Sequence, residues 1–416
     1  MNLFFLFSLL FSSLFYHSFP VGGFPTSTNV SAIMSLNCRC SRYIEKGFLE
    51  CIINIGKSVP GVPLYISNVH GDEPVGRELL ILLANWLCHN YMKDPFATLI
   101  VDNVHLHILP SVNPDGFSLR QLRNANNIDL NRDFPDQFFH MNDDPGAHQP
   151  ETKAIMRWLE EMRFTASGTL HGGALVANYP WDGPDDKKKY YYGCPDDETF
   201  RYMACIYSRF HHNMSLSEEF PGGIRNGAYW YPSSGGMLDW NYLYAGCFEL
   251  TLEISDDKWP NASELPTLFE YNKMSMLNLV ASLVKTGIHG RIFSSDEGRP
   301  IAASIAIKGL NSTVHARETL GDYHRLLAPA GKYEVIATMP GDKSRSTRIV
   351  LGEEAMRVDF VMDSVITPTN SFLQRRWSCS LPGPHLEILF ILVLVLVSVF
   401  VCFLLKRGVI LNYPKQ

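Results

Sequence analysis

The stretch Ile66-Ser67-Asn68-Val69-His70-Gly71-Asp72-Glu73-Pro74 decides the fold of this chain. The stretch Leu64–Val69 is strand-like, and a helical pattern begins at Pro74 and continues to Cys88. A strand that passes directly into a helix belongs to an α/β sheet, whose ligands bind at the carboxyl ends of the strands. We therefore expect His70 and Glu73 to point into one cavity above this edge.

The chain continues the alternation of strands and helices up to about residue 285. We expect strands at Leu99–Leu109, Ala166–His171 and Cys247–Ile254, and helices at Glu151–Arg163, Asp197–His212 and Leu268–Lys285. Asp72 is the expected N-cap of the helix 74–88. This order predicts an α/β sheet covered by helices on both faces. After Gly287 the segments become short and extended, with turn residues between them, which predicts a small all-β domain.

The residue types at the strand ends favour a metal site. His171 ends a predicted strand in Thr169-Leu170-His171-Gly172-Gly173, as His70 does in the first stretch. Imidazole and carboxylate are zinc ligands, and a catalytic site keeps one position for water. A His-x-x-Glu pair alone is more typical of a surface helix, but the strand-to-helix turn and the second strand-end histidine favour His70, Glu73 and His171 as ligands.

A strand near residue 250 carries two carboxylates on one side. Glu249 and Glu253 are four residues apart, and Glu253 lies at the carboxyl end, where a zinc site needs a base. The alternative is an edge strand with solvated glutamates.

Two further motifs suggest how a substrate is held. Asn131 and Arg132 offer donors that match a carboxylate. Tyr231 precedes Gly235-Gly236 in a loop, where the alternative is a turn with aromatic packing. These residues together indicate a zinc hydrolase that binds a free carboxylate.

The motifs His70-x-x-Glu73, Asn131-Arg132, His171, Tyr231…Gly235-Gly236 and Thr251-Leu252-Glu253 resemble the metallocarboxypeptidases, specifically the regulatory group that includes carboxypeptidases N, E, M and D. The resemblance covers about residues 56–363 and is nearest to the plant membrane-anchored members of the group. It implies a zinc carboxypeptidase-like α/β domain, with a mixed central sheet flanked by helices, at 37–286. A transthyretin-like β sandwich is then expected at 287–364.

The resemblance also implies the roles of individual residues. One zinc ion is expected on His70, Glu73 and His171, with Glu253 as general base and later acid. Asn131 and Arg132 hold the C-terminal carboxylate of the peptide, and Tyr231 caps the terminal residue. The family's carbonyl-polarising arginine aligns with Leu122, so Arg123 is its expected substitute. The acidic run that reads a C-terminal Lys or Arg matches Asp196 and Asp197, while Leu238 stands where the family usually has Gln.

One region departs from the family pattern. Between Ile55-Gly56 and Val69-His70 the family carries about twenty more residues, so we expect one edge of the sheet to be missing or rewired. Two alternatives to an active enzyme for basic C-termini stay open. One is a catalytically impaired or inactive peptide-binding paralogue or truncated isoform, and the other is a hydrolase of small acylated amino acids.

Apolar segments at both ends predict the topology of a type I membrane protein. Residues 1–23 read as a signal peptide, 365–387 as a stalk, 388–405 as a transmembrane helix and 406–416 as a cytoplasmic tail with Lys406 and Arg407. A lipid anchor is the alternative for the last apolar segment. The catalytic domain is then expected in the secretory or endosomal lumen or at the cell surface, where the sequons at Asn29, Asn213, Asn261 and Asn311 can be glycosylated.

The composition limits the class of partner. The 416 residues are 46% hydrophobic and 19% charged, with a net charge of −6 and no basic tract. These values indicate a globular chain and argue against nucleic acid as a partner. Peptide or proprotein C-termini are the expected partners, with the membrane bound through the single span.

Overall fold

The computed structural model describes residues 39–45, 48–56, 62–139, 144, 146–310, 312–341 and 343–363. The predicted signal peptide, stalk, membrane span and cytoplasmic tail lie outside these residues. Within them, no helix has both the length and the apolar character needed to cross a membrane.

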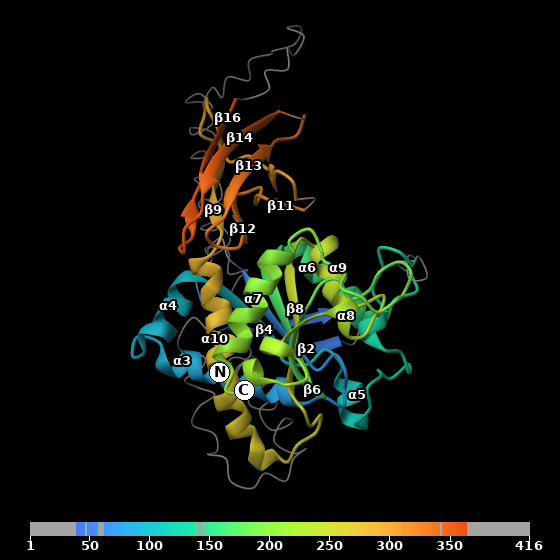
Figure 1. Cartoon of the computed structure of the whole chain (residues 1–416). Coiled ribbons are helices and arrows are strands. Elements are labelled where there is room, and N and C mark those ends of the chain that lie inside the picture. The colour runs from blue at the N-terminus through green and yellow to red at the C-terminus, as the bar shows by residue number, and fades with distance from the viewer. Residues whose placement is uncertain are drawn as a thin grey trace, which may run out of the picture. The chain divides into compact units, whose positions relative to one another are not determined.

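The centre of the first part is a mixed sheet of eight strands in the order β1-β2-β4-β3-β5-β8-β6-β7. Figure 1 labels β2, β4, β6 and β8 of this sheet. Strands β4, β3, β5 and β8 run parallel to one another. The pairs β1–β2, β2–β4 and β6–β8 are antiparallel, and β7 pairs parallel with β6. The strands are β1 (Arg39–Glu45), β2 (Phe48–Gly56), β3 (Pro63–Ser67), β4 (His105–Leu109), β5 (Ala166–His171), β6 (Ala174–Tyr179), β7 (Ile224–Asn226) and β8 (Phe248–Ser255).

Helices cover both faces of this sheet, as the sequence predicts, and each face has its own apolar core. Neighbouring residues of β3 point to opposite faces, so Tyr65 joins one core and Leu64 and Ile66 join the other. The first core lies under α3 (Val75–Asn90), α4 (Pro95–Asn103), α7 (Asp197–Phe210) and α10 (Leu265–Lys285). The second lies under α6 (Pro150–Met162) and α9 (Met237–Leu243), and α5 (Pro114–Leu119) and α8 (Gly227–Trp230) lie in the loops.

Two local predictions are wrong. Residues 99–103 are helical rather than extended. Asp94 accepts hydrogen bonds from the amides of Phe96 and Ala97, and Pro95 stands in the first turn. This cap starts α4 before the strand begins at His105. Asp72 does not cap α3, whose N-cap is Pro74 without a side-chain hydrogen bond.

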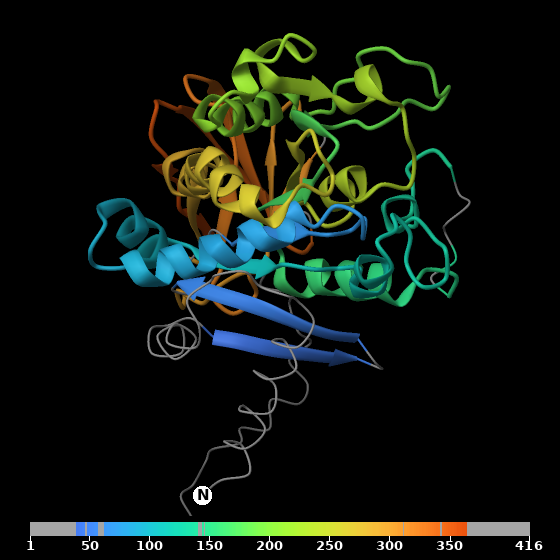
Figure 2. The same ribbon diagram turned by 90° about the horizontal axis from the view of Figure 1, so that it is seen from below.

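The edge of the sheet beside β4 is occupied. Strand β2 pairs with β4 from Ile53↔Ile108 to Gly56↔His105, and β1 pairs with β2 along its whole length. Figure 2 shows these two strands in dark blue at the outer side of the sheet. The expected loss of an edge strand is therefore not what the structure has, since six residues between Gly56 and Pro63 suffice to connect β2 to β3.

The residues after 287 form two small sheets around a third apolar core. One sheet has the order β11-β10-β13-β14, and in the other β9 pairs with β12, β15 and β16. Ile288, Ile305, Val335 and Phe360 come from both sheets and meet in one cluster, so the two sheets face each other. The strands are β9 (Ile288–Ser294), β10 (Ser304–Ile307), β11 (Thr313–His315), β12 (Asp322–Arg325), β13 (Lys332–Thr338), β14 (Ser344–Val350), β15 (Met356–Arg357) and β16 (Phe360–Met362).

Candidate metal centre and substrate site

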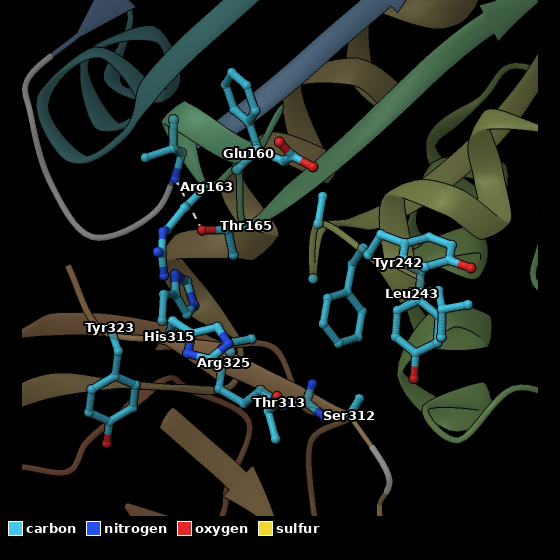
Figure 3. A pocket seen from close by; sticks show the side chains of 18 of the residues that line it. Glu160, Arg163, Thr165, Tyr242, Leu243, Ser312, Thr313, His315, Tyr323 and Arg325 are labelled. Carbon is cyan, nitrogen blue, oxygen red and sulfur yellow. Dashed lines mark hydrogen bonds between the residues drawn. The ribbon is translucent and has the colours of Figure 1, made fainter. Parts of the chain in front are cut away.

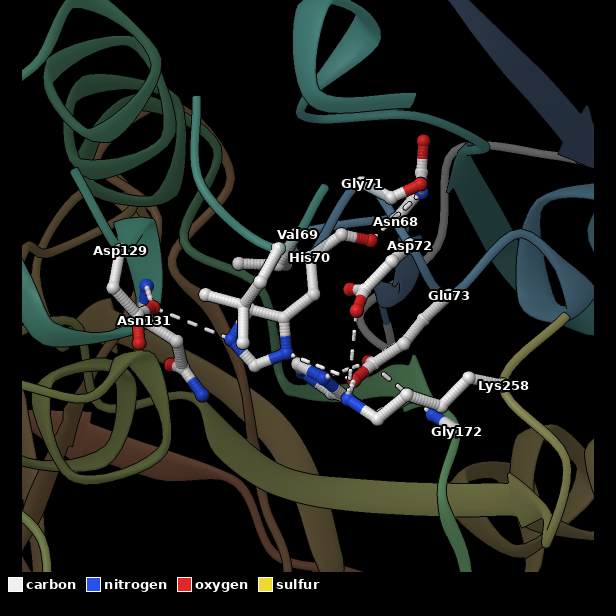
Figure 4. Close-up of polar contacts among 12 residues, drawn as sticks. Asn68, Val69, His70, Gly71, Asp72, Glu73, Asp129, Asn131, Gly172 and Lys258 are labelled. Carbon is white, nitrogen blue, oxygen red and sulfur yellow. Dashed lines mark hydrogen bonds and ion pairs between the residues drawn. The ribbon is translucent and has the colours of Figure 1, made fainter. Parts of the chain in front are cut away.

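The carboxyl ends of β3 and β5 bring His70, Glu73 and His171 together (Figure 4). After β3 the chain turns at Asn68, which has a φ of 56° and whose side-chain amide donates to the His70 carbonyl at 2.8 Å. β5 runs parallel to β3 and ends at His171, so both strands deliver their last residues to the same edge. One possible ligand atom from each of the three side chains lies within 4.8 Å of the others.

The donor set fits a zinc ion. The Nδ1 atoms of the two imidazoles face the two oxygens of one carboxylate, at 3.1 Å from His70 to Glu73 Oε1 and 2.9 Å from His171 to Glu73 Oε2. Two histidine nitrogens and one carboxylate are the protein ligands of a catalytic zinc site. The other ring nitrogen of His70 lies 3.2 Å from Asp129 Oδ1, and such an outer carboxylate orients a metal-binding imidazole.

Asp129 is a residue that the sequence analysis missed. It stands two positions before Asn131, in a stretch already singled out, and its Oδ1 also accepts from the Asn131 amide at 2.9 Å. One carboxylate therefore orients both the metal centre and the loop that is expected to bind the substrate carboxylate. The sequence feature that could have indicated Asp129 is its position two residues before the expected carboxylate-binding residue Asn131.

The electrostatics of the cluster suit a cation. Burial alone would lower the pKa of His70, but hydrogen bonds to Asp129 and Glu73 outweigh it and raise the pKa to about 9. Burial would raise the pKa of Glu73, yet the two histidines hold it well below its usual range. For His171 burial prevails and the pKa is lowered. The carboxylates around His70 therefore favour a positive charge at this position, which a divalent cation can supply.

Lys258 is a second residue that the sequence did not indicate. Its Nζ lies 2.6 Å from Glu73 Oε1 and 3.9 Å from Asp72 Oδ2. Gly173 leaves room for this side chain, because a Cβ there would lie 2.9 Å from Lys258 Cε, and its φ of +114° also disfavours other residues. Lys258 therefore contacts the same oxygen of Glu73, Oε1, that faces His70 Nδ1.

The two glutamates of β8 differ in their surroundings. Glu253 pairs in register with His171, and its Oε2 is buried without a hydrogen-bond partner among the described residues. Burial first, and then the charge of Glu73, raise the pKa of Glu253 well above its usual range. Glu249 lies four residues earlier in the strand and is fully buried. Burial raises its pKa to about 7, although several side chains donate hydrogen bonds to it. Of the two, Glu253 has the free oxygen and the position beside the metal ligands.

The expected carboxylate-binding residues lie next to this centre. Asn131 and Arg132 belong to the short helix η1 (Leu130–Arg132), which continues from Asp129. Asn131 Oδ1 accepts from the Met237 amide at 3.0 Å, which leaves its Nδ2 donors for a ligand. Tyr231 follows α8, and its side chain is 69% exposed. Asn131 and Arg132 are thus held in place, while Tyr231 has room to move.

Among the described residues, Arg123 has no hydrogen bond or ion pair with the metal ligands. Its side chain is exposed and donates to the Asn127 carbonyl at 3.2 Å. Leu122, at the aligned position, contributes its carbonyl to the amide of Gly71 at 3.2 Å. The local turn therefore uses the backbone of this segment to support the His70 loop, and the expected substitution by Arg123 has no structural support.

Asp196 and Asp197 also lie in unexpected surroundings. Asp196 is buried in an ion pair with Arg325 of β12, at 2.6 Å between Oδ1 and Nη2. Asp197 is half-buried at the start of α7 and accepts from the Tyr191 hydroxyl at 2.5 Å. The predicted role of Asp196 in reading a basic side chain conflicts with this placement, because its charge is already neutralised by Arg325.

A different pair of buried carboxylates lies near the substrate-binding loop. Asp182 and Asp239 are 7% and 8% exposed, and both oxygens of Asp239 accept from the Asp182 amide, at 3.0 and 3.1 Å. A Cβ built on Gly236 would lie 3.1 Å from Asp182 Oδ2 and 3.6 Å from Asn131 Oδ1, so Asp182 and Asn131 flank this glycine. Burial raises the pKa of Asp182, and the charge of Arg132 opposes that rise.

The sequence also matches known proteins. The profile of the zinc carboxypeptidase family matches residues 54–275. Carboxypeptidase SOL1 of Arabidopsis thaliana is 56% identical, over 95% of this chain and 85% of that protein. Human carboxypeptidase D is 40% identical over 78% of this chain, which spans about a quarter of that protein's length. Bovine thrombin-activatable fibrinolysis inhibitor, solved in complex with tick carboxypeptidase inhibitor, has a TM-score of 0.49 and 15% identity over 61% of this chain and 92% of that one.

Proposed function

The chain belongs to the zinc carboxypeptidase family and is a metallocarboxypeptidase, and from this premise we propose that it removes C-terminal Arg or Lys residues from peptides. The observation that carries the proposal is the pair of buried carboxylates, Asp182 and Asp239, beside the Asn131–Arg132 loop. A terminal residue whose carboxylate is bound by that loop would place its side chain near them.

His70, Glu73 and His171 would hold the zinc ion, which supplies Lewis acidity toward the scissile carbonyl and makes the attacking water more acidic. Glu253 Oε2 accepts a proton from that water and passes it to the leaving amine. Burial and the charge of Glu73 raise the pKa of Glu253, which makes its ionised form a stronger proton acceptor and its protonated form the donor to the amine.

Substrate binding uses the donors beside the metal centre. Asn131 Nδ2 and the guanidinium of Arg132 would hold the C-terminal carboxylate, and the exposed Tyr231 would close over the terminal residue. A peptide without a free C-terminal carboxylate would leave these donors unpaired, which explains why an enzyme with this site cleaves at chain ends.

The charge balance of the pocket favours a basic side chain. Burial makes ionisation of Asp182 and Asp239 costly, and an entering guanidinium or ammonium would offset that cost. Leu238, which is 1% exposed, offers no polar contact. A charge-assisted hydrogen bond contributes about 1.5–3 kcal/mol, whereas the neutral bond lost at Leu238 is worth about 0.5–1.5 kcal/mol. The charge should prevail, so Leu238 weakens the preference without reversing it.

The test compares kcat/KM for matched peptides that end in Arg, Lys, Leu or Phe. We expect Arg and Lys to be preferred, and Asp182→Asn to lower the Arg-to-Leu ratio by roughly 10- to 150-fold. Asp197→Asn tests the carboxylate that the sequence indicated, and should leave the ratio unchanged because that carboxylate bonds to Tyr191. Equal or better cleavage of Phe-ending peptides by the unmutated protein would defeat the proposed selectivity.

We also propose that the enzyme is a type I membrane protein with its catalytic domain in the lumen of the secretory or endosomal system or at the cell surface. Cys88 is disulfide-bonded, and disulfides persist in oxidising compartments. The sequon residues Asn213 and Asn261 are exposed, so both can be glycosylated. Protease added to intact vesicles should remove only the tail from Lys406 onward, and digestion of the catalytic domain would contradict this topology.

A further inference from the structure

Asp196 and Arg325 form a buried junction between the catalytic sheet region and the following β-strands. Both side chains are fully buried, and Arg325 Nη2 lies 2.6 Å from Asp196 Oδ1. Ser312 donates to Asp196 Oδ2 and accepts from Arg325 Nη2 at 2.8 Å. The Tyr242 hydroxyl donates to the same Asp196 Oδ2 at 2.7 Å. We call these four residues the junction network.

The junction network borders a cavity rather than a closed apolar interface. The cavity measures about 430 Å³, and Tyr242, Ser312 and Arg325 are among the residues that line it (Figure 3). The Arg325 guanidinium lies 4.9 Å from the centre of the Phe248 ring, which is also in the wall. Because apolar packing is incomplete here, the polar contacts of the network have to fix how the two regions meet.

Helix α9 connects this junction to the substrate pocket. At its start, the Met237 amide donates to Asn131 Oδ1 at 3.0 Å, and Asp239 binds the Asp182 amide. At its end, Tyr242 bonds to Asp196. Seven helical residues extend only about 10 Å and behave as one rigid body, so a movement at Tyr242 is transmitted to Met237 and Asp239.

We propose that the β-strands after residue 287 position the substrate pocket, because Arg325 acts through Asp196 and Tyr242 to hold α9 in register with Asn131 and Asp182. Arg325 and Tyr242 are thus positioning residues and do not contact the substrate. The inference rests on the substrate pocket proposed above and adds the element that sets its shape.

The test uses the full-length enzyme and the variant Tyr242→Phe, which removes one hydroxyl and keeps a ring that packs against Trp181 and Phe200. The matched control is Tyr333→Phe. The Tyr333 hydroxyl donates to the carbonyl of Ala328, and the Ala328 amide donates to the Thr199 hydroxyl of α7. This variant therefore also removes one hydroxyl near the junction, but that hydroxyl does not bond to α9.

In Tyr242→Phe we expect KM for an Arg-ending peptide to rise by roughly two- to thirtyfold while kcat stays within about twofold, since Glu253 and the metal ligands are unaffected. Backbone amides of residues 238–243 should exchange hydrogen faster than in the unmutated enzyme. Tyr333→Phe should leave KM and this exchange unchanged. Arg325→Lys keeps the charge but not the planar fork, and should change KM in the same direction.

Equal KM values and equal exchange in Tyr242→Phe and Tyr333→Phe would overturn the positioning role. A change in kcat with KM unchanged would also overturn it. If Arg325→Lys fails to fold, the comparison of the two tyrosine variants still decides. Failure of the proposed function has a different signature, which is an unmutated enzyme without preference for Arg over Leu. In that case the KM comparison is made with the peptide that the enzyme cleaves best.

Discussion

The two glutamates of β8 should give opposite results when each is changed to Gln. Glu253 pairs with His171 across the sheet and has an unpartnered, buried Oε2, whereas Glu249 lies four residues earlier and is fully hydrogen-bonded. Both substitutions keep the side-chain shape and remove one titrating group. The pair therefore separates the loss of a proton acceptor from the loss of a structural carboxylate.

For Glu253→Gln we expect kcat to fall by about 10²–10⁴-fold, the usual contribution of a general base. No hydrogen bond to Oε2 is lost, and burial already favours the neutral side chain, so the free energy of unfolding should change by less than about 1 kcal/mol. Zinc content should remain one ion per protein, because the ligands are His70, Glu73 and His171.

For Glu249→Gln we expect the reverse. Ser167 and Asn241 donate to Glu249 Oε2, and Thr169 donates to Oε1 at 2.5 Å. A Gln side chain presents an NH₂ group to one set of these donors, which leaves buried polar groups unpaired at a cost of about 1–3 kcal/mol. The activity of each folded, zinc-loaded molecule should remain close to that of the unmutated enzyme.

The assay measures kcat on an Arg-ending peptide, normalised to zinc content, together with urea unfolding of each variant. Activity of Glu253→Gln near the unmutated level would refute its role as base. If Glu249→Gln instead lost activity at full zinc occupancy, the proton acceptor would be Glu249, and the argument from the free oxygen of Glu253 would be wrong.

Three other outcomes follow from the structure. Asp196→Asn should lower the free energy of unfolding in urea by about 3–5 kcal/mol, because it leaves Arg325 buried without its counter-charge. Asp197→Asn should lower it by less than about 1 kcal/mol. Similar losses of unfolding free energy in the two variants would contradict the importance of the buried ion pair. The pKa of Glu249 near 7 lies above its unfolded value, so the folded state binds more protons between about pH 4.5 and 7. The free energy of unfolding should therefore fall by about 3 kcal/mol as the pH rises through this window. Glu249→Gln should flatten that slope in urea titrations at different pH values, and an unchanged slope would exclude this carboxyl as its source. Removal of zinc with a chelator should abolish hydrolysis and lower Tm, and added zinc should restore both; activity that persists in zinc-free protein would refute the metal assignment.

Sequence patterns predicted the elements of the metal centre because each ligand belongs to a short, regular segment. His171 ends β5 and His70 follows three residues after β3, which pairs with β5 in parallel, and the turn into α3 fixes Glu73 three residues after His70. The partner carboxylate Asp129 and the ion-paired Lys258 are not visible in this way. They come from loops whose path depends on packing, such as the approach of Lys258 to Gly173.

The boundaries of elements were less predictable, since local capping competes with side-chain preference. Residues 99–103 carry a Leu-Ile-Val run that favours a strand, yet the Asp94 cap and Pro95 start a helix that includes them. The edge strands β1 and β2 posed a different difficulty. The pairing of β2 with β4 is a long-range contact, and a family spacing that is short by about twenty residues does not reveal that six residues can still make the connection to β3.

The placement of Asp196 shows why an acidic residue near a motif is weak evidence for substrate recognition. A carboxylate one residue before a helix is equally suited to bind a ligand or to bind the protein itself, and which occurs depends on a partner far away in the sequence. Here that partner is Arg325, 129 residues later, in the β-strands. The same strands then gain a connection to the catalytic region, since Tyr242 binds the shared carboxylate from α9. A carboxylate that is neutralised by an internal arginine cannot select a basic substrate side chain, so the proposed selectivity requires a charge from elsewhere. Asp182 and Asp239 meet that requirement, because no internal cation forms a salt bridge with either of them among the described residues, and they lie next to the loop that would hold the substrate carboxylate.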